Sequence, residues 1–343
     1  MELKRGDMCS LNCTIKDFKE SVFPIAYLSV FILGIVGHLI SMYVFFSVWR
    51  KKRSLTTVNL FMVNLLVSDL MLVCSLPFRA SYYLSGSRWK FGRVACKLIF
   101  YVFYLNMNTS IYFLVSLNFM RYLALVQPYR YKSLQKWCNG HLVCFLIWLF
   151  VALSSSPLLI LSKGVNASVS VDEQCMELPN NNQTIQNLIS INNATLTVGF
   201  LVPLALILWC SLFVAYRLWK LGPSQHTVST SRKKAFALVI ISLSFFIICF
   251  LPYHVIRIVF LNTELDVSNG TYGNSRESVL LLRKASVVTL CLCVAHSCLD
   301  PILFFFVGEN FRTFFAKLLR RKKMDKYTRK RGQQGAELRI LQK

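Results

Sequence analysis

The sequence predicts an all-α membrane protein, a bundle of seven transmembrane helices. Of its 343 residues, 55% are hydrophobic and only 16% are charged, whereas a typical soluble domain is about a quarter charged. Apolar stretches long enough to cross a bilayer alternate with polar breaks. Their ranges are about 23–48, 57–84, 93–127, 141–162, 188–219, 234–261 and 280–306. We therefore expect a single membrane domain with an odd number of spans.

The third apolar stretch is expected to lie in the middle of the bundle. As a helix, the segment from Cys96 to Arg121 would be about 37 Å long at ~1.5 Å per residue, which exceeds the ~30 Å hydrocarbon core of a bilayer. Unpaired polar groups are costly in hydrocarbon, so the polar side chains of this stretch need partners on other helices. These side chains are Asn106, Asn108, Thr109, Ser110, Ser116 and Asn118.

The net charge of +24 raises the question of nucleic-acid binding, but the placement of the basic residues argues against it. They cluster at alternate ends of the apolar stretches, which is the positive-inside pattern of cytoplasmic loops. The amino terminus is thus expected outside and the carboxy terminus inside, where a basic tail favours anionic membrane lipids. The basic clusters are Arg50–Arg53, Arg130/Lys132/Lys136, Arg232–Lys234 and Arg320–Lys323.

The chain divides into four parts. Residues 1–22 form a polar extracellular tail without the features of a removable signal peptide. Residues 23–306 form the bundle. Residues 307–323 are expected to form an amphipathic helix on the membrane surface, because aromatic and aliphatic residues recur there at helical spacing. Residues 324–343 are basic and are expected to be disordered.

Two kinds of covalent modification are expected on the outer face. Four glycosylation sequons fall on that side, at Asn12, Asn166, Asn182 and Asn269. Cys96 begins the third span and Cys175 lies between the fourth and fifth, so a disulfide between them would tie the second outer loop to the bundle. The alternative is two unpaired thiols. Cys9 and Cys13 either pair with each other or stay free.

Buried ionisable residues mark a polar core. Asp69 in the second span and Asp300 in the seventh lie at a depth where carboxylates are costly, so each is a functional candidate. With Ser110 of the third span they would share a sodium ion, placed at Asp69, or a proton. His296 is one turn from Asp300. The alternative is a static hydrogen-bonded core.

Five prolines lie inside apolar stretches, where they remove a backbone hydrogen bond and bend the helix. Phe246 and Phe250 are one turn apart just before one of them and would form an aromatic block, although core packing explains this pair equally well. The prolines are Pro77, Pro157, Pro203, Pro252 and Pro301.

The outer half of the bundle is rich in cations. Arginine at this depth needs an anion, and the neighbouring spans offer no obvious acidic residue at the same depth. We therefore predict a pocket for a ligand with carboxylates or phosphates and apolar surface. Interfacial snorkelling is the alternative, most plausible for Arg283 and Lys284. The predicted ligand-binding residues are Arg79, Tyr83, Tyr104, Tyr253, His254, Arg257, Arg283 and Lys284.

A set of motifs resembles the rhodopsin-like G-protein-coupled receptors over about residues 22–320. The set is Cys96/Cys175, Asn64–Asp69, Arg121-Tyr122, Trp148, Pro203, Phe250–Tyr253 and Asp300–Phe304. More narrowly, Leu76–Ala80, Tyr82–Leu84, Ser110–Leu114 and Phe250–His254 resemble the purinergic-type branch. Within that branch the chain is similar to the cysteinyl leukotriene receptors, and Cys13–Lys19 and Gly308–Phe311 fit their second subtype.

The resemblance implies a plasma-membrane receptor that binds an anionic lipid mediator and activates heterotrimeric G proteins, chiefly of the phospholipase C–calcium type. Arg79, Tyr104, Tyr253 and Arg257 match positions that line the ligand pocket of the family. Arg121 matches the arginine that inserts toward the G protein, and the switch set would add Phe246, Phe250, Pro252 and Pro301. Arrestin is a further candidate partner.

Four positions depart from the pattern of the family. His38 stands where the first span normally has asparagine, and Met120 where an acid normally precedes the arginine. Ser211 and Phe304 each replace a tyrosine that helps to hold the active arrangement. Because restraints on both the inactive and the active state are lost, the direction in which these replacements shift the balance between the two states stays open.

Two other functions compete with a leukotriene receptor. A nucleotide or dicarboxylate receptor would use the same arginine, histidine and tyrosine side chains. A scavenger that binds without signalling, or a partner subunit, would fit the replacements at Ser211 and Phe304. The sequence shows no inverted repeat typical of a transporter. It also shows no nucleophile–base pair or metal-spaced cluster that would indicate an enzyme.

Overall fold

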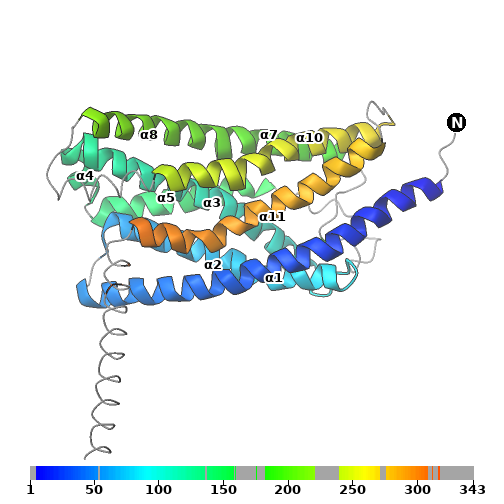
Figure 1. Ribbon diagram of the computed structural model, residues 1–343, viewed down its shortest axis with the longest axis horizontal. Helices are drawn as coiled ribbons and strands as arrows, with labels where there is room; N and C mark the ends of the chain where they lie inside the picture. The colour runs from blue at the N-terminus through cyan, green and yellow to red at the C-terminus, as the bar shows by residue number, and fades with distance from the viewer. Residues whose placement is uncertain are drawn as a thin grey trace, which may run out of the picture.

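The computed structural model describes residues 5–52, 55–135, 137–157, 159, 175, 182–220, 239–270, 276–307, 311 and 316. These residues form long helices that run roughly side by side (Figure 1). Residues 239–244 are also helical and lead into the segment η3. The elements are α1 (Arg5–Lys52), α2 (Thr57–Leu84), α3 (Gly92–Val126), α4 (Pro128–Leu134), α5 (Trp137–Ser155), α7 (Asn182–Ala194), η2 (Thr195–Leu201), α8 (Val202–Lys220), η3 (Phe245–Phe250), α10 (Leu251–Ser268) and α11 (Arg276–Val307).

The predicted seven-helix bundle is the observed fold. Six helices of the described segments are long and apolar enough to cross a membrane: Ile15–Lys51, Thr57–Leu84, Gly92–Val126, Asn182–Arg217, Val239–Ser268 and Arg276–Phe306. The expected fourth span corresponds to α5, whose apolar part Gly140–Ser155 is shorter. Most of the remainder of that expected span, residues 158 and 160–162, lies outside the described residues.

Helix α1 begins earlier than its apolar stretch. The sequence places residues 1–22 in a tail, yet α1 is helical from Arg5 onward. Tertiary contacts stabilise this extension. Glu20 accepts a hydrogen bond of 2.9 Å from Ser87, and the ring centroid of Phe18 lies 5.7 Å from Nζ of Lys284. Hydropathy alone marks the part of a helix that lies in lipid, so it misses a helix that continues into water.

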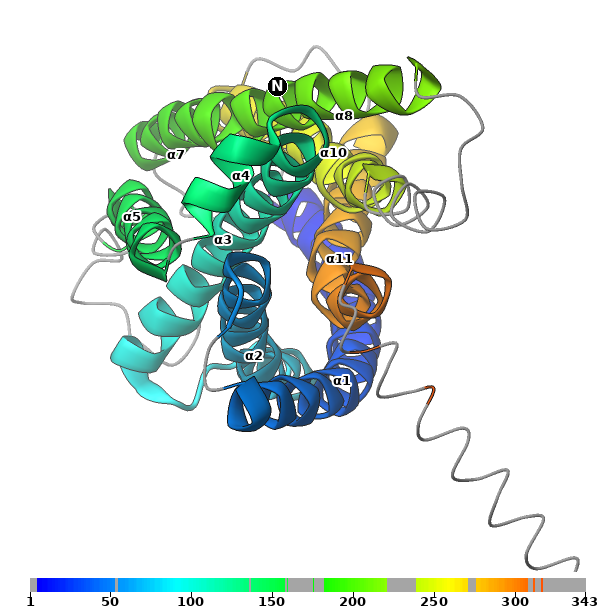
Figure 2. The ribbon, with the colours of Figure 1, turned by 90° about the vertical axis from the view of Figure 1, so that its left-hand side faces the viewer.

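Helix α3 lies in the centre, as its polar residues predict. It contacts α2, α5 and α8, and it runs between them in the end view of Figure 2. Neighbouring helices supply partners for Asn106, Ser110 and Asn118, three of its six predicted polar residues. The amide nitrogen of Asn106 donates to Asp69 Oδ1 at 3.0 Å, and that of Asn118 donates to Ser242 Oγ at 2.8 Å.

Two of the buried prolines each follow a short π-helical segment. Segment η2 ends just before Pro203 and η3 just before Pro252. In both, the residue before the proline donates its backbone N–H five residues back, from Val202 to Thr197 and from Leu251 to Phe246. A proline has no N–H and its ring crowds the carbonyl four residues earlier, so the preceding turn widens. Pro77 and Pro301 lie inside α2 and α11 without such a turn.

Helices α1 and α11 approach closely at His38, where the sequence departs from the pattern of the family that it resembles. His38 is fully buried, and its Nε2 lies 2.8 Å from the carbonyl oxygen of Ser297. One residue earlier, a Cβ on Gly37 would lie 2.8 Å from Cγ of Pro301. A glycine followed by a hydrogen-bonding side chain therefore fixes this contact.

The expected amphipathic helix at 307–323 is described only at its first residue, 307, and at residues 311 and 316. Phe311 is buried against Phe45 and Phe304, with ring centroids 5.0 and 6.1 Å away. The apolar face predicted for this segment therefore contacts the bundle at Phe311. Residues 317–343, which include the expected disordered tail, lie outside the described residues.

Candidate ligand-binding site and signalling core

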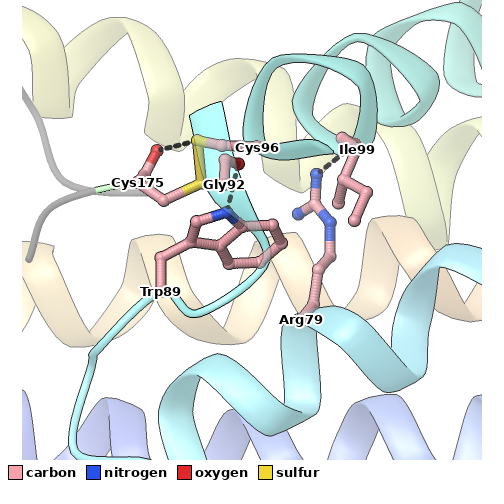
Figure 3. The surroundings of a disulfide bond; sticks show 6 residues. All are labelled: Arg79, Trp89, Gly92, Cys96, Ile99 and Cys175. Carbon is pink, nitrogen blue, oxygen red and sulfur yellow. Dashed lines mark hydrogen bonds between the residues drawn. A yellow bond between two sulfur atoms is a disulfide. The ribbon is translucent and has the colours of Figure 1, made fainter. Parts of the chain in front are cut away.

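The predicted disulfide is present at the outer end of α3. Cys96 and Cys175 are bonded, with their Cα atoms 5.8 Å apart (Figure 3). Trp89 packs beside this bridge, fully buried, and its indole nitrogen donates to the carbonyl oxygen of Gly92 at 2.7 Å. Gly92 has a φ of 78°, a left-handed conformation that suits glycine and turns the chain into α3.

Arg79 points into the bundle beneath this bridge (Figure 3). Its side chain is 4% exposed, one guanidinium nitrogen donates to the carbonyl oxygen of Ile99 at 3.1 Å, and Nε has no hydrogen-bond partner. The guanidinium also lies 5.0 Å from the ring centroid of Phe103. No carboxylate of the described residues forms an ion pair with Arg79. The site is therefore cationic and only partly satisfied by the protein.

A pocket in the outer half brings together four of the predicted ligand residues. Its lining includes Tyr104 of α3 and Tyr253, His254 and Arg257 of α10. Arg257 lies 5.8 Å from the ring centroid of Phe260, and no described carboxylate pairs with it. One positive charge thus lies beside two phenol groups in this pocket, an arrangement that suits an anionic group.

The pocket also has lining residues that the sequence did not single out. They come from α3, from α7 and from the start of η2: Met107, Leu188, Ile191, Asn192 and Thr195. None of these residues carries a charge or a phenol group, the features that mark most of the predicted ligand residues. Helix α7 begins at Asn182, earlier than the expected span, which brings its apolar face beside α10. The amphipathic pattern of residues 182–194 was the signal that would have found them.

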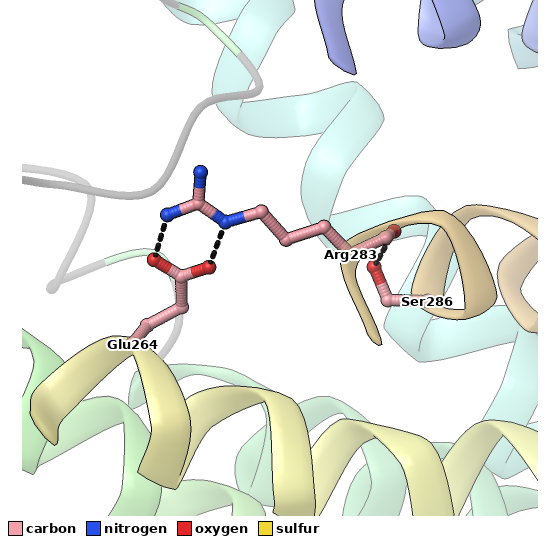
Figure 4. Close-up of polar contacts among 3 residues, drawn as sticks. All are labelled: Glu264, Arg283 and Ser286. Carbon is pink, nitrogen blue, oxygen red and sulfur yellow. Dashed lines mark hydrogen bonds and ion pairs between the residues drawn. The ribbon is translucent and has the colours of Figure 1, made fainter. Parts of the chain in front are cut away.

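Arg283, which is expected from the sequence to lack an acidic partner, forms an ion pair with Glu264. Its Nε and one terminal nitrogen donate to the two carboxylate oxygens of Glu264 at 2.6 and 2.8 Å, which joins α11 to α10 (Figure 4). The expectation that the neighbouring spans hold no acidic residue at this depth is therefore wrong for Arg283. Lys284, next to it, lies 5.7 Å from the ring centroid of Phe18 of α1.

Tyr83 lies in an aromatic cluster away from the pocket. It is 5% exposed and packs between Phe23 and Tyr82, with centroids 4.5 and 4.9 Å away. Of the eight predicted ligand residues, four therefore line the pocket. Arg79, Tyr83, Arg283 and Lys284 lie elsewhere in the outer half.

A series of aromatic rings leads from the pocket to the polar core. His254 stacks on Phe200 of η2 at 4.5 Å, and Phe200 stacks on Phe246 at 5.7 Å. Phe246 contacts Phe250 at 5.6 Å, and Phe250 contacts His296 of α11 at 4.8 Å. The predicted aromatic block thus lies between the two sites, on the π-helical turn before Pro252. Direct packing contacts therefore connect His254 with His296.

The polar core contains the residues predicted for it. Asp69 Oδ1 accepts hydrogen bonds from Asn106 at 3.0 Å and from Ser110 at 3.4 Å. Asp69, His296 and Asp300 each offer a ligand atom, and these three atoms lie within 4.8 Å of one another. Asp69 Oδ2 and both carboxylate oxygens of Asp300 are buried without a hydrogen-bond partner. This cluster therefore has unused capacity for a cation or a proton.

Three of the four departures from the family pattern, Met120, Ser211 and Phe304, are buried at the end of the bundle that the sequence places inside. Met120 and Phe304 are buried in the core, and Ser211 is buried with a hydroxyl that lacks a partner. No acid precedes Arg121, but three residues earlier Asn118 donates to Ser242 at 2.8 Å. This bond links α3 directly to the helical segment at 239–244.

Three of the four predicted glycosylation sequons begin within the described residues. Asn182 begins α7, Asn269 follows α10, and their exposed side-chain amides share a hydrogen bond of 2.8 Å. Asn12 lies in the extension of α1. Asn166 lies outside the described residues.

The fold and the site define a class of protein. A family model for the 7 transmembrane receptor (rhodopsin family) matches residues 41–304, so the chain belongs to this family of G-protein-coupled receptors. It is 39% identical over 312 residues to cysteinyl leukotriene receptor 2 of Homo sapiens, covering 91% of this chain and 85% of that protein. It is 34% identical to cysteinyl leukotriene receptor 1 of Homo sapiens, covering 87% of this chain and 85% of that protein. Identity to the human uracil nucleotide/cysteinyl leukotriene receptor is 34%, over 89% of this chain and 78% of that protein.

We predict that the Glu264–Arg283 ion pair stabilises the outer end of the bundle. The two side chains are 14% and 18% exposed, so removing one leaves a poorly solvated charge. The variants Glu264→Gln and Arg283→Gln should each lower the unfolding midpoint of the purified protein. The double variant should lose less unfolding free energy than the two single variants lose together. The expected coupling energy is about 1–2 kcal/mol.

The Lys16–Glu20 pair is a matched control, because its atoms are 3.8 Å apart and Lys16 is 52% exposed. Lys16→Gln should change the stability by less than about 0.5 kcal/mol. A coupling energy near zero for Glu264 and Arg283 would contradict the prediction.

We also predict that the Asn118–Ser242 hydrogen bond restrains the inner end. Coupling requires this end to admit a G protein, and a bond between two helices holds them at one spacing. Asn118→Ala and Ser242→Ala should each raise ligand-independent nucleotide exchange on a G protein by roughly 2- to 10-fold, the population shift expected for one hydrogen bond.

Ser116→Ala is the control for this bond, because Ser116 donates only within its own helix, to the carbonyl oxygen of Tyr112. Its basal rate should stay at the wild-type value. Equal basal rates in all four proteins would refute a restraining role.

Proposed function

We propose that this chain is a plasma-membrane receptor for a cysteinyl leukotriene or a closely similar lipid acid, and that it signals through heterotrimeric G proteins. The observation that carries the proposal is the pair Arg79 and Arg257. Both lie in the outer half of the bundle, and no carboxylate of the described residues forms an ion pair with either. The relatives named above make a leukotriene the first ligand to test.

The chemistry of the site supports a ligand that has both charge and apolar surface. Arg257, Tyr104 and Tyr253 offer donors to a carboxylate, and Met107, Leu188 and Ile191 offer apolar contact in the same pocket. Arg79 of α2 does not line this pocket, and we propose it as a second cation for a ligand that extends beyond the pocket. A peptide-conjugated fatty acid carries several carboxylates and a long hydrocarbon chain, so it matches both halves of this site.

The proposed topology has the amino terminus outside and the carboxy terminus in the cytoplasm. The placement of basic clusters and of four sequons supports it. We propose glycans at Asn12, Asn166, Asn182 and Asn269, and contacts between the basic tail and anionic lipids. On the inner side, Arg121 is the residue proposed to meet the G protein, with calcium release as the response. Arrestin is a proposed second partner, and we propose no catalytic activity.

The polar core fits a sodium ion, which we propose as an allosteric ligand. Asp69, Ser110 and Asp300 would hold it, because buried carboxylate oxygens without hydrogen-bond partners suit a hard cation. The ion would supply the positive charge that the core lacks.

A nucleotide is the second candidate ligand. The same Arg257, His254 and Tyr253 side chains suit phosphates, and one relative is named for both uracil nucleotides and cysteinyl leukotrienes. A scavenger that binds without signalling is a further alternative, motivated by Ser211 and Phe304.

The test is calcium release in cells that express the chain, with cysteinyl leukotrienes, nucleotides and small diacids as agonists. We expect a response to a leukotriene. Arg257→Ala should lower its potency by about 10- to 100-fold, the loss expected for charge-assisted hydrogen bonds, and Arg257→Lys should lose less. Arg88→Ala, the same substitution at an exposed outer arginine, should keep wild-type potency.

Surface expression of each variant is measured with an amino-terminal epitope. Unchanged potency in Arg257→Ala would refute the role of this arginine. A response to a nucleotide alone would favour the second candidate. Leukotriene binding without nucleotide exchange on any G protein would favour the scavenger.

A further inference from the structure

The polar core contains a histidine whose hydrogen bonding is typical of a metal ligand. His296 is 1% exposed, and its Nδ1 donates to the backbone carbonyl oxygen of Cys293. A proton held on Nδ1 leaves the lone pair on Nε2, and Nε2 is buried without a partner. Histidines that bind metals show the same pattern, in which a backbone carbonyl or carboxylate holds the other ring nitrogen and fixes the tautomer.

The two carboxylates beside it are positioned in a similar way. Asn106 and Ser110 hold Oδ1 of Asp69, which leaves Oδ2 free. Neither oxygen of Asp300 accepts a hydrogen bond from a neighbouring N–H or hydroxyl group, and its carboxyl group lies next to that of Asp69. Four buried atoms that could bind a metal ion therefore receive no hydrogen bond from an N–H or hydroxyl group of the described residues. They are Nε2 of His296, Oδ2 of Asp69 and both carboxylate oxygens of Asp300. No ion pair of the described residues includes Asp69 or Asp300.

We propose that Asp69, Asp300 and His296 form a binding site for a divalent transition-metal ion, with Zn²⁺ as the best fit. This inference goes beyond the sodium ion proposed above, because it depends on an imidazole nitrogen in the donor set. Sodium has no preference for such a donor, whereas imidazole with carboxylates suits zinc and its neighbours in the first transition row. Two carboxylates also balance a divalent charge that a monovalent ion would leave half compensated.

The geometry requires a small contraction. Zinc binds histidine nitrogen and carboxylate oxygen at about 2.0–2.2 Å, which places tetrahedral ligand atoms about 3.3 Å apart. The three ligand atoms here lie within 4.8 Å of one another, so shifts of about 1 Å are sufficient. The second oxygen of Asp300, a water molecule or Ser110 would complete the coordination. Magnesium and calcium are poorer fits, since they favour six or more oxygen ligands.

A metal ion at this site would regulate the receptor, because it joins two helices and lies next to the aromatic series. Asp69 belongs to α2, and His296 and Asp300 belong to α11. The ring of His296 also packs against Phe250 at 4.8 Å. Coordination of Nε2 would hold this ring in place and thereby restrict the last contact between the pocket and the core.

The experiment uses the full chain, purified without a polyhistidine tag and freed of metal by chelation. Cobalt(II) serves as a spectroscopic substitute for zinc, since its visible absorption reports coordination by nitrogen and oxygen directly. We expect cobalt absorption bands, displacement of cobalt by zinc, and a rise of at least about 3 °C in the unfolding midpoint with micromolar zinc at constant sodium concentration. No leukotriene is needed, so the result is independent of the proposed ligand.

The variants His296→Asn and Asp300→Asn should each weaken cobalt binding by at least about tenfold. His141→Asn is the matched control, because it makes the same substitution at an exposed histidine of α5. It should bind cobalt like the wild type. If His296→Asn fails to fold, as judged by size-exclusion chromatography, Asp300→Asn and the wild-type spectrum still decide the question.

Two results would overturn the proposal. The first is stabilisation by sodium with no cobalt spectrum and no zinc effect, which would leave a sodium site. The second is a zinc effect that persists in His296→Asn and Asp300→Asn, which would place the ion elsewhere. Failure to bind either cation would indicate that the two carboxylates share a proton, and it would also refute the zinc site.

Discussion

Hydrocarbon offers no hydrogen-bond partners, and this constraint organises the whole bundle. A polar side chain within the spans finds its partner either on the backbone of its own helix or on another helix, and the second kind of bond joins helices. Trp148 of α5 donates to Asn64 of α2 at 3.0 Å, and Asn106 of α3 donates to Asp69 of α2. His38 holds α1 against α11 through the carbonyl oxygen of Ser297. These bonds fix which helices are neighbours and keep α3 in the centre.

The same constraint identifies the functional sites, because they are the places where the protein does not satisfy its own polar groups. Arg79 and Arg257 have no carboxylate partner among the described residues, and Asp300 and Nε2 of His296 have no hydrogen bond. The outer site is cationic and the core site is anionic, so each favours an external ion of opposite charge. The aromatic series through Phe246 and Phe250 connects them across a π-helical turn that Pro252 imposes.

Much of this arrangement could be predicted from the sequence, because hydropathy and charge are local properties. The spans, the disulfide, the central place of α3 and the gathering of Tyr104, Tyr253 and Arg257 all follow from residue type and depth. The ion pair of Arg283 with Glu264 could not be predicted in this way, since it depends on the rotation of two helices about their axes. The continuation of α1 ahead of its apolar stretch is accompanied by contacts of Glu20 with Ser87 and of Phe18 with Lys284, which hydropathy does not report. The metal-binding character of His296 depends on the hydrogen bond at its other ring nitrogen, which only coordinates reveal.

The central claim is that the guanidinium of Arg257, which has no carboxylate partner among the described residues, recognises a carboxylate of the ligand. The most direct measurement is competition binding of a cysteinyl leukotriene and its carboxyl methyl ester, to the wild type and to Arg257→Gln. Esterification should weaken binding to the wild type by about tenfold or more, and most of this difference should disappear in the variant. Equal affinity of acid and ester for the wild type, or an undiminished difference in Arg257→Gln, would contradict the account.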